Sequence, residues 1–281
     1  MKRPSYKTQA FVLRFLNYGE SDRIVTFFTR EFGKVRGIAK GARRSKKRFS
    51  NAIEPFSHST LLFSRRGEDS LSIIENCDVI NHYPQIRANL RRTMTASYMI
   101  DLVDQFTEEG KKSAGIFQLL GDFLGLLETG NGLEETTRFF ELRLLRLSGY
   151  EPVLGKCVIC NTPLDKINAA FFDATRGGIR CSLCGRGDQE CIPVSAGTLK
   201  TLLLGKQTET DRIHRLVLSE NALKESRVIF RHFIRHILGK EPKSLQVLDE
   251  ISKMICPETA KPQNYQGSEV GDRGSGLIPD T

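Results

Sequence analysis

Residues 19–48 read GESDRIVTFFTREFGKVRGIAKGARRSKKR, and this stretch decides the fold of the N-terminal part of the chain. The segment Arg23–Thr29 is rich in β-branched and aromatic residues, which is the composition of a strand. Gly33, Gly37 and Gly41 follow at intervals of four residues. Glycines inside a strand pattern often mark bends or bulges where a small barrel turns a corner. The stretch therefore predicts strands joined by tight turns.

Short apolar runs continue on both sides of this stretch. They occur at Ala10–Leu13, at Leu61–Phe63 and at Leu71–Ile74. About five short strands at this spacing fit an OB-fold, although a generic small β-barrel fits the pattern equally well. We assign residues 1–80 to an OB-fold domain.

From about residue 84 the apolar residues follow a helical period. Leu90, Met94, Tyr98, Leu102 and Phe106 lie four apart, on one face of a helix. Two more helices follow, and Gly149 and Pro152 end the second of them. The segment 221–238 predicts a later amphipathic helix. We therefore expect an α+β protein, with a helical domain over residues 81–256 and a polar, disordered tail over residues 257–281.

Four of the seven cysteines form two CxxC pairs, Cys157 with Cys160 and Cys181 with Cys184. Each pair forms a turn that directs two thiolates to one point, and two such turns close a tetrahedral cage around zinc. Four thiolates leave no open coordination position, so we expect one structural zinc ion in a ribbon-like insert over residues 150–192.

Other interpretations of the cysteines remain open. Two redox-active CxxC pairs would need a βαβ setting, which the pattern lacks. An iron–sulfur cluster is a second alternative. Cys191 lies seven residues after Cys184 and is a possible replacement ligand, whereas Cys77 and Cys256 are interpreted as buried or incidental thiols.

Positive charge is concentrated in the predicted barrel. The whole chain carries a formal charge of +9, and residues 1–80 hold 16 Lys and Arg against 8 Asp and Glu, a difference of +8. Such a cluster favours binding of a phosphate backbone through counterion release, without reading the base sequence. The predicted DNA-binding residues are Lys34, Arg36, Lys40, Arg43, Arg44, Lys46, Lys47 and Arg48.

Single strands are usually held by a basic groove together with aromatic platforms. Phe15, Tyr18 and Phe49 are the candidate platforms, and each is alternatively a packing residue. A possible second basic surface lies on the helix at 221–238, where it would hold a second strand or an acidic peptide unless it is only a solvated helix face. Its residues are Lys224, Arg227, Arg231 and Arg235.

Catalytic motifs are not found in the sequence. It contains no GxxxxGK[ST], GxSxG or HExxH pattern, so we expect no enzymatic activity. Two other interpretations stay open: a zinc-dependent enzyme that modifies nucleic acid, and a basic scaffold that binds acidic protein tails. No apolar run is long enough for a membrane span and the Met1 end has no signal-like apolar region, so we expect a cytoplasmic, nucleoid-associated protein.

Two stretches resemble the RecO family of bacterial DNA repair proteins. One is residues 19–34 followed by 41–44, and the other runs from residues 139–152 into the first CxxC pair. The resemblance implies an OB-fold, a helical domain and a zinc module. It also implies binding to single- and double-stranded DNA and annealing of complementary strands. The implied partners are RecR, the acidic tail of single-strand-binding protein and, indirectly, RecA. Family members help to load RecA onto DNA that is coated with single-strand-binding protein.

Overall fold

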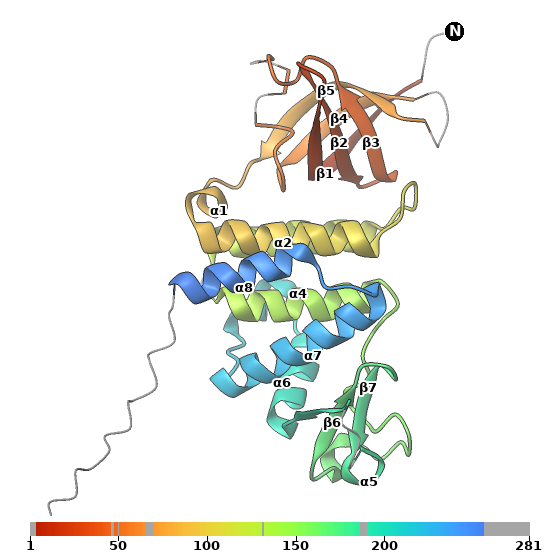
Figure 1. Cartoon of the computed structure of the whole chain (residues 1–281), viewed down its shortest axis with the longest axis vertical. Coiled ribbons are helices and arrows are strands. Elements are labelled where there is room, and N and C mark those ends of the chain that lie inside the picture. Colours follow the sequence, from red (N-terminus) through yellow and green to blue (C-terminus); the bar gives the residue numbers. More distant parts are fainter. Residues whose placement is uncertain are drawn as a thin grey trace, which may run out of the picture.

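Three parts succeed one another along the long axis of the molecule: a β-barrel, a stack of helices and a small cysteine-rich module (Figure 1). The computed structural model describes residues 4–45, 48–49, 51–65, 70–130, 132–185 and 190–255. The predicted tail after residue 256 lies outside these residues. The α+β class expected from the sequence is confirmed.

Five strands close the N-terminal barrel in the order β1-β2-β3-β5-β4, as in an OB-fold. The strands are β1 (Ser5–Tyr18), β2 (Asp22–Thr29), β3 (Gly33–Ala39), β4 (His58–Ser64) and β5 (Ser72–Asn81). The first part of β1 pairs with β4, and its later part pairs with β2. A register shift between Val12 and Arg14 lets this long strand change partners.

The alternation of side chains along β3 explains why this sequence forms a barrel wall. Val35 and Ala39 are buried in the barrel core, whereas Lys34 and Arg36 point to the other side. Gly33 and Gly41 have φ angles of +64° and +68° and form turns, as predicted. Gly37 lies within the strand. A Cβ atom there would lie 2.3 Å from Cδ1 of Ile74, so this position has no room for a side chain. The bend predicted at Gly37 is therefore a close packing contact instead.

Helix α2 is the centre of the helical part and packs against α1, α3, α4 and α8. The helices are α1 (Pro84–Ala88), α2 (Leu90–Phe106), α3 (Ala114–Thr129), α4 (Leu133–Leu147), α6 (Ala196–Gln207), α7 (Glu220–Leu238) and α8 (Lys243–Ile255), with a 3-10 turn η2 (Thr210–Arg215). Figure 1 shows α2 directly below the barrel, α8 and α4 beneath α2 at nearly the same level, and α7 further below. None of the described helices is long and apolar enough to cross a bilayer.

The barrel and the helices are joined by both apolar and ionic contacts. Phe11 belongs to the helical core cluster rather than to the barrel interior, and its ring centroid lies 4.9 Å from that of Phe117 in α3. The carboxylate of Asp104 in α2 forms ion pairs with Lys34 Nζ at 3.1 Å and with Arg14 Nε at 2.9 Å. Gly33 lies so close to the loop after α2 that a Cβ atom would be 2.3 Å from the carbonyl oxygen of Lys111. These contacts fix which side of the barrel faces the helices.

Replacing Gly33 with alanine tests this junction. Gly33→Ala meets backbone rather than a movable side chain, whereas Gly19, at φ +59°, has no atom within 4 Å of the added Cβ position. Both changes place alanine in the left-handed region, which costs about 1–2 kcal/mol. We expect Gly33→Ala to lower the free energy of unfolding by about 1–3 kcal/mol more than Gly19→Ala does. Denaturant unfolding measures this, and equal losses would contradict the close junction.

Candidate metal centre and nucleic-acid interface

A three-stranded sheet carries the cysteine module, with strand order β7-β6-β8. Its elements are η1 (Leu164–Lys166), β6 (Ala170–Asp173), β7 (Gly178–Cys181), α5 (Ser182–Gly185) and β8 (Ile192–Val194). The β6–β7 hairpin separates the two CxxC pairs, as the sequence predicts. The backbone N–H of Val158 donates to the carbonyl of Ile179 at 2.8 Å, which attaches the first CxxC turn to the hairpin.

The four predicted cysteines converge on one point. The Sγ atoms of Cys157, Cys160, Cys181 and Cys184 all lie within 4.8 Å of one another. Those of Cys160 and Cys181 are 3.7 Å apart. Tetrahedral zinc, with Zn–S bonds of about 2.3 Å, places sulfur atoms about 3.8 Å apart, so this spacing fits the ion.

The four thiols affect one another's ionisation. The Thr162 hydroxyl and backbone N–H lower the pKa of Cys160 to about 6, whereas its thiol neighbours, Cys181 foremost, raise the pKa of Cys184 to about 12. Burial acts to raise the pKa of Cys157, but N–H donors from Cys160 and Cys181 lower it overall. Four sulfur atoms this close cannot all carry negative charge unless a cation balances them.

Cys191 is not part of the four-sulfur group. Its Sγ accepts a hydrogen bond from Arg180 Nη1 at 3.4 Å, and the same guanidinium pairs with Asp173 at 3.1 Å. The module also shares the core of the helices, because the rings of Phe172 in β6 and Phe233 in α7 lie 5.5 Å apart. Loss of a metal ion would therefore affect the helices as well as the module.

The described residues of the basic run after β3, 41–45 and 48–49, are called the basic loop here, and residues 41–43 lie beside the tip of the β1–β2 hairpin. Asp22 accepts the backbone N–H of Gly41 at 2.8 Å, and this bond holds the pKa of that carboxyl below its usual value. The Arg43 guanidinium donates to the carbonyl oxygens of Gly19 and Glu20, at 3.3 and 3.1 Å. The Arg48 guanidinium donates to the carbonyl of Lys40 at 2.8 Å. Because a carbonyl carries no net charge, these hydrogen bonds position the two guanidinium groups without pairing them with an anion.

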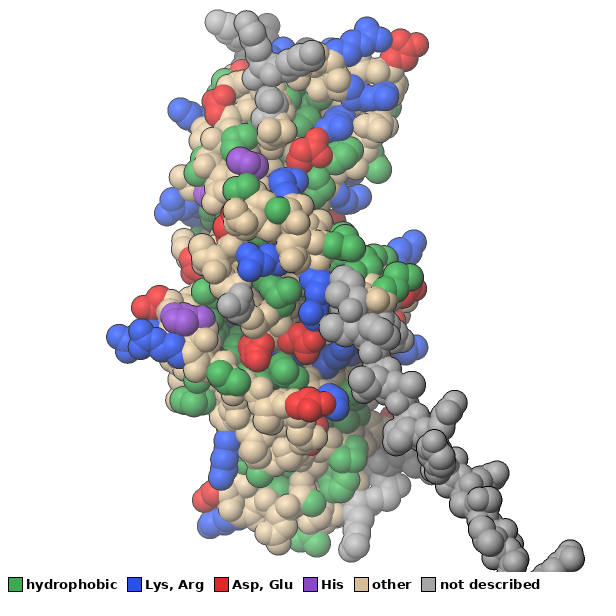
Figure 2. Space-filling view, turned by 90° about the vertical axis from the view of Figure 1, so that its left-hand side faces the viewer, with side chains coloured by type: hydrophobic (Ala, Val, Ile, Leu, Met, Phe, Trp, Pro, Cys, Tyr) green, Lys and Arg blue, Asp and Glu red, His purple; other side chains and the backbone are tan. Residues whose placement is uncertain are grey.

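The other predicted barrel cations differ in their surroundings. Arg36 and Lys40 are exposed, and Arg44 pairs with Glu20 at 3.4 Å in a fully solvated setting. Lys34 is only 13% exposed and is occupied by Asp104. Lys46 and Lys47 lie outside the described residues. In the space-filling view, blue Lys and Arg side chains gather mainly at the upper right of the barrel end, with red acidic and green apolar side chains among them (Figure 2).

The predicted basic stripe on α7 faces α8 over part of its length. Arg227 pairs with Asp249, and Arg231 pairs with Asp249 at 2.8 Å and with Glu241. Lys224 pairs with Glu220 one turn earlier, and Arg235 is exposed. Two of the four cations therefore stabilise the α7–α8 contact.

The structure distinguishes the three candidate stacking platforms. Phe49 is 3% exposed, and Phe15 is half-buried beneath the guanidinium of Arg23, 4.1 Å from its ring centroid. Tyr18 is 57% exposed at the tip of the β1–β2 hairpin. Of the three, Tyr18 has the ring surface that is accessible to a ligand.

Family models match nearly all of the described chain. The model "Recombination protein O N terminal" covers residues 1–83, and "Recombination protein O C terminal" covers residues 87–246. The chain belongs to the RecO family. A "DNA repair protein RecO" from Syntrophus aciditrophicus is 49% identical over 254 residues, which are 90% of this chain and 98% of that relative. One from Geobacter metallireducens is 37% identical over 248 residues, 88% of this chain and 98% of the relative.

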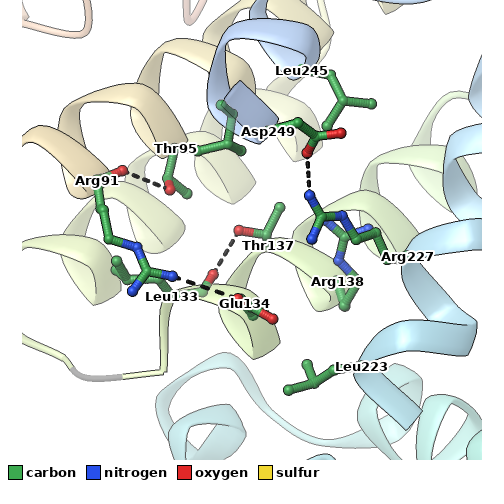
Figure 3. Close-up of a pocket in the computed structure, with 11 residues that line it drawn as sticks. Arg91, Thr95, Leu133, Glu134, Thr137, Arg138, Leu223, Arg227, Leu245 and Asp249 are labelled. Carbon is green, nitrogen blue, oxygen red and sulfur yellow. Dashed lines mark hydrogen bonds and ion pairs between the residues drawn. The ribbon is translucent and has the colours of Figure 1, made fainter. Parts of the chain in front are cut away.

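This RecO-family chain also has a cavity that sequence reasoning missed, between α2, α4, α7 and α8 (Figure 3). Leu133, Leu223, Leu245 and Leu248 supply apolar walls. Arg91, Arg138 and Arg227 supply cations, and Arg138 is 7% exposed with Nη1 bound to Glu141 at 2.9 Å. A signal was present, because Arg138 and Glu141 are charged residues within an apolar helix pattern.

Changing one cysteine tests the metal centre. In Cys157→Ser the cluster loses a buried thiolate, so the zinc content of the purified protein should fall from one ion per chain towards zero. The melting temperature should fall by several degrees, since the module shares the helical core.

Cys191→Ser is the matched control and should keep one zinc ion per chain. Metal analysis and thermal melting give both readouts. Full zinc content in Cys157→Ser, or a zinc-free wild-type protein purified with zinc present, would contradict the assignment.

Proposed function

We propose that this protein is a non-enzymatic mediator of recombinational DNA repair, which binds single- and double-stranded DNA and anneals complementary strands. The observation that carries the proposal is the basic loop on an OB-type barrel, where the guanidinium groups of Arg43 and Arg48 are positioned by carbonyl oxygens rather than by carboxylates. The name DNA repair protein RecO, which its relatives carry, supports the role in repair.

A phosphate contact adds affinity without selecting a base sequence, which is what an annealing protein requires. Lys34 and Arg14 are bound to Asp104, which marks the side of the barrel that faces α2. The basic loop lies at the other end of the barrel. We therefore assign phosphate binding to Lys40, Arg43, Arg44 and Arg48, with Lys46 and Lys47 as further candidates from the sequence. Arg36 lies on the α2 side, but it is kept as a candidate because its side chain is 47% exposed beside Glu109. Lys34, Arg227 and Arg231 pair with the largely buried carboxylates of Asp104 and Asp249 and are left out.

The cysteine cluster supports a structural role for the metal. Four sulfur ligands would occupy all four coordination positions of a tetrahedral zinc ion and leave none for a reacting water molecule. We therefore favour the mediator over a zinc-dependent enzyme. With the family, we further propose that the protein acts with RecR to promote RecA loading on DNA coated with single-strand-binding protein.

The triple variant Arg43→Ala, Arg44→Ala, Arg48→Ala tests the basic loop. Each lost phosphate contact should reduce the slope of log affinity against log salt by about 0.7 for single strands, so the triple variant should lose about two. It should also anneal complementary oligonucleotides more slowly at low salt.

The matched control changes three exposed cations of the helical part, Arg212, Arg215 and Lys240, to alanine. It removes the same charge and should leave most of the slope and the annealing rate unchanged. If both triple variants behave alike, or if the wild-type protein never accelerates annealing, the proposal is wrong.

The cavity at Arg138 is our candidate site for the acidic tail of single-strand-binding protein. Asp249 and Glu134 are already paired with Arg227 and Arg91, so they do not oppose an incoming carboxylate with their full charge (Figure 3). Nη1 of Arg138 forms an ion pair with Glu141. Burial raises the pKa of the Glu141 carboxyl, although Arg138 and Tyr98 act to lower it. A carboxylate next to apolar walls matches the chemistry of this cavity.

Arg138→Met combined with Glu141→Gln tests the cavity without leaving a buried unpaired charge. Loss of a charge-assisted hydrogen bond should weaken binding of the labelled tail peptide by at least about tenfold. Glu141→Gln alone is the control and should keep the affinity, because Arg138 remains. Fluorescence anisotropy measures both, and unchanged peptide affinity in the double variant would exclude this site.

A further inference from the structure

An apolar row crosses the outer surface of the barrel. In the strand register Leu16 of β1 lies opposite Ile24 of β2, Ile24 opposite Ile38 of β3, and Ile38 beside Ile73 of β5. Residues directly opposite in a sheet project from the same face. Leu16 is 57% exposed, and the three isoleucines are half-buried. We call these four residues the outer apolar row.

Charged side chains border the outer apolar row on the side of the helices. Two residues closer to α2 along each strand, on the same face of the sheet, lie Arg14, Thr26 and Arg36. Arg14 pairs with Asp104, and Arg36 lies 3.8 Å from a carboxylate oxygen of Glu109. Both arginines stay about half exposed, at 54% and 47%. This edge of the row is therefore anchored to the helical part and still presents positive charge.

The opposite edge of the row is formed by the hairpin tip and the basic loop. Tyr18 follows Leu16 on the same face of β1 and is 57% exposed. The next residue, Gly19, accepts a hydrogen bond from Arg43 through its carbonyl, so an exposed aromatic ring and a charged guanidinium share this tip. The sheet thus presents apolar side chains between two edges that carry arginines, of which Arg14, Arg36 and Arg44 also have carboxylate partners.

This pattern fits a polymer that carries negative charge along its backbone and flat apolar rings on one side. Single-stranded DNA has both, whereas the bases of a duplex are stacked inside and unavailable. An apolar protein surface would cover the cations without offering them anions, which costs free energy. Charge complementarity therefore favours a nucleic acid over a protein as the occupant.

We propose that the outer apolar row and Tyr18 receive unstacked bases of single-stranded DNA, while Arg43 and Arg48 hold its phosphates. The inference rests on the proposed DNA binding by the barrel and adds a base-dependent preference for single strands. Phosphate contacts act on both kinds of DNA, but base contacts are available only in a single strand.

The experiment compares a thymidine oligonucleotide with an abasic oligonucleotide of equal length, which carries the same phosphates without bases. Stacking of even one base should make the wild-type protein bind the normal strand about fivefold or more tightly than the abasic strand. The variant Leu16→Ser, Tyr18→Ala should bind both strands equally. It should keep the duplex affinity and the salt slope of the wild-type protein.

Leu147→Ser with Tyr150→Ala is the matched control. It removes the same residue types from exposed positions of the helical part, at 46% and 49% exposure, and should keep the base dependence. Thermal melting checks that both double variants remain folded, as their surface positions predict.

Equal wild-type affinity for normal and abasic strands would overturn this inference and leave the phosphate-binding proposal standing. A wild-type protein that binds no DNA would instead overturn the proposed function itself. Base dependence that survives in Leu16→Ser, Tyr18→Ala would place the bases elsewhere. If that variant loses a protein partner and keeps its base dependence, the outer apolar row is a protein interface and the inference is wrong.

Discussion

The carboxylate of Asp104 at the end of α2 fixes the orientation of the barrel, because it binds Arg14 from β1 and Lys34 from β3 together. Asp104 and Lys34 are 17% and 13% exposed, so both charges are largely withdrawn from water and each needs the other. Phe11 packs into the helical core beside this ionic contact. One side of the barrel is thereby covered, and the face with the basic loop and the outer apolar row is left to solvent.

The same principle explains how this protein uses its many arginines. Arg227 and Arg231 pair with Asp249 between helices, where an unpaired charge would be costly. Arg43 and Arg48 are oriented by carbonyl oxygens at the barrel tip, where their charge stays available. A cation held by a neutral acceptor has a defined position, and its charge is not balanced by that acceptor. That combination separates the proposed DNA surface from the structural ion pairs.

The cysteine module is continuous with the helices rather than appended to them. Cys157, Phe172 and Ile179 belong to the same core cluster as α7 and α4. A metal ion at the four sulfur atoms would therefore stabilise the surroundings of the cavity at Arg138 as well as the module. The two candidate binding regions, on the barrel and between the helices, rest on separate cores, so each can be altered without loss of the other.

The sequence by itself determined most of the elements and the four cysteines of the candidate metal site. Local patterns carry that information: the period of two in β3, the period of four in α2, and the paired CxxC turns that bring thiolates together. The generic barrel and the OB-fold could not be separated in this way, since strand order depends on contacts between distant residues. The tertiary structure decided which charges are available. Lys34 and Arg43 look alike in the sequence, but only Lys34 meets a carboxylate, and that carboxylate lies 70 residues further along the chain.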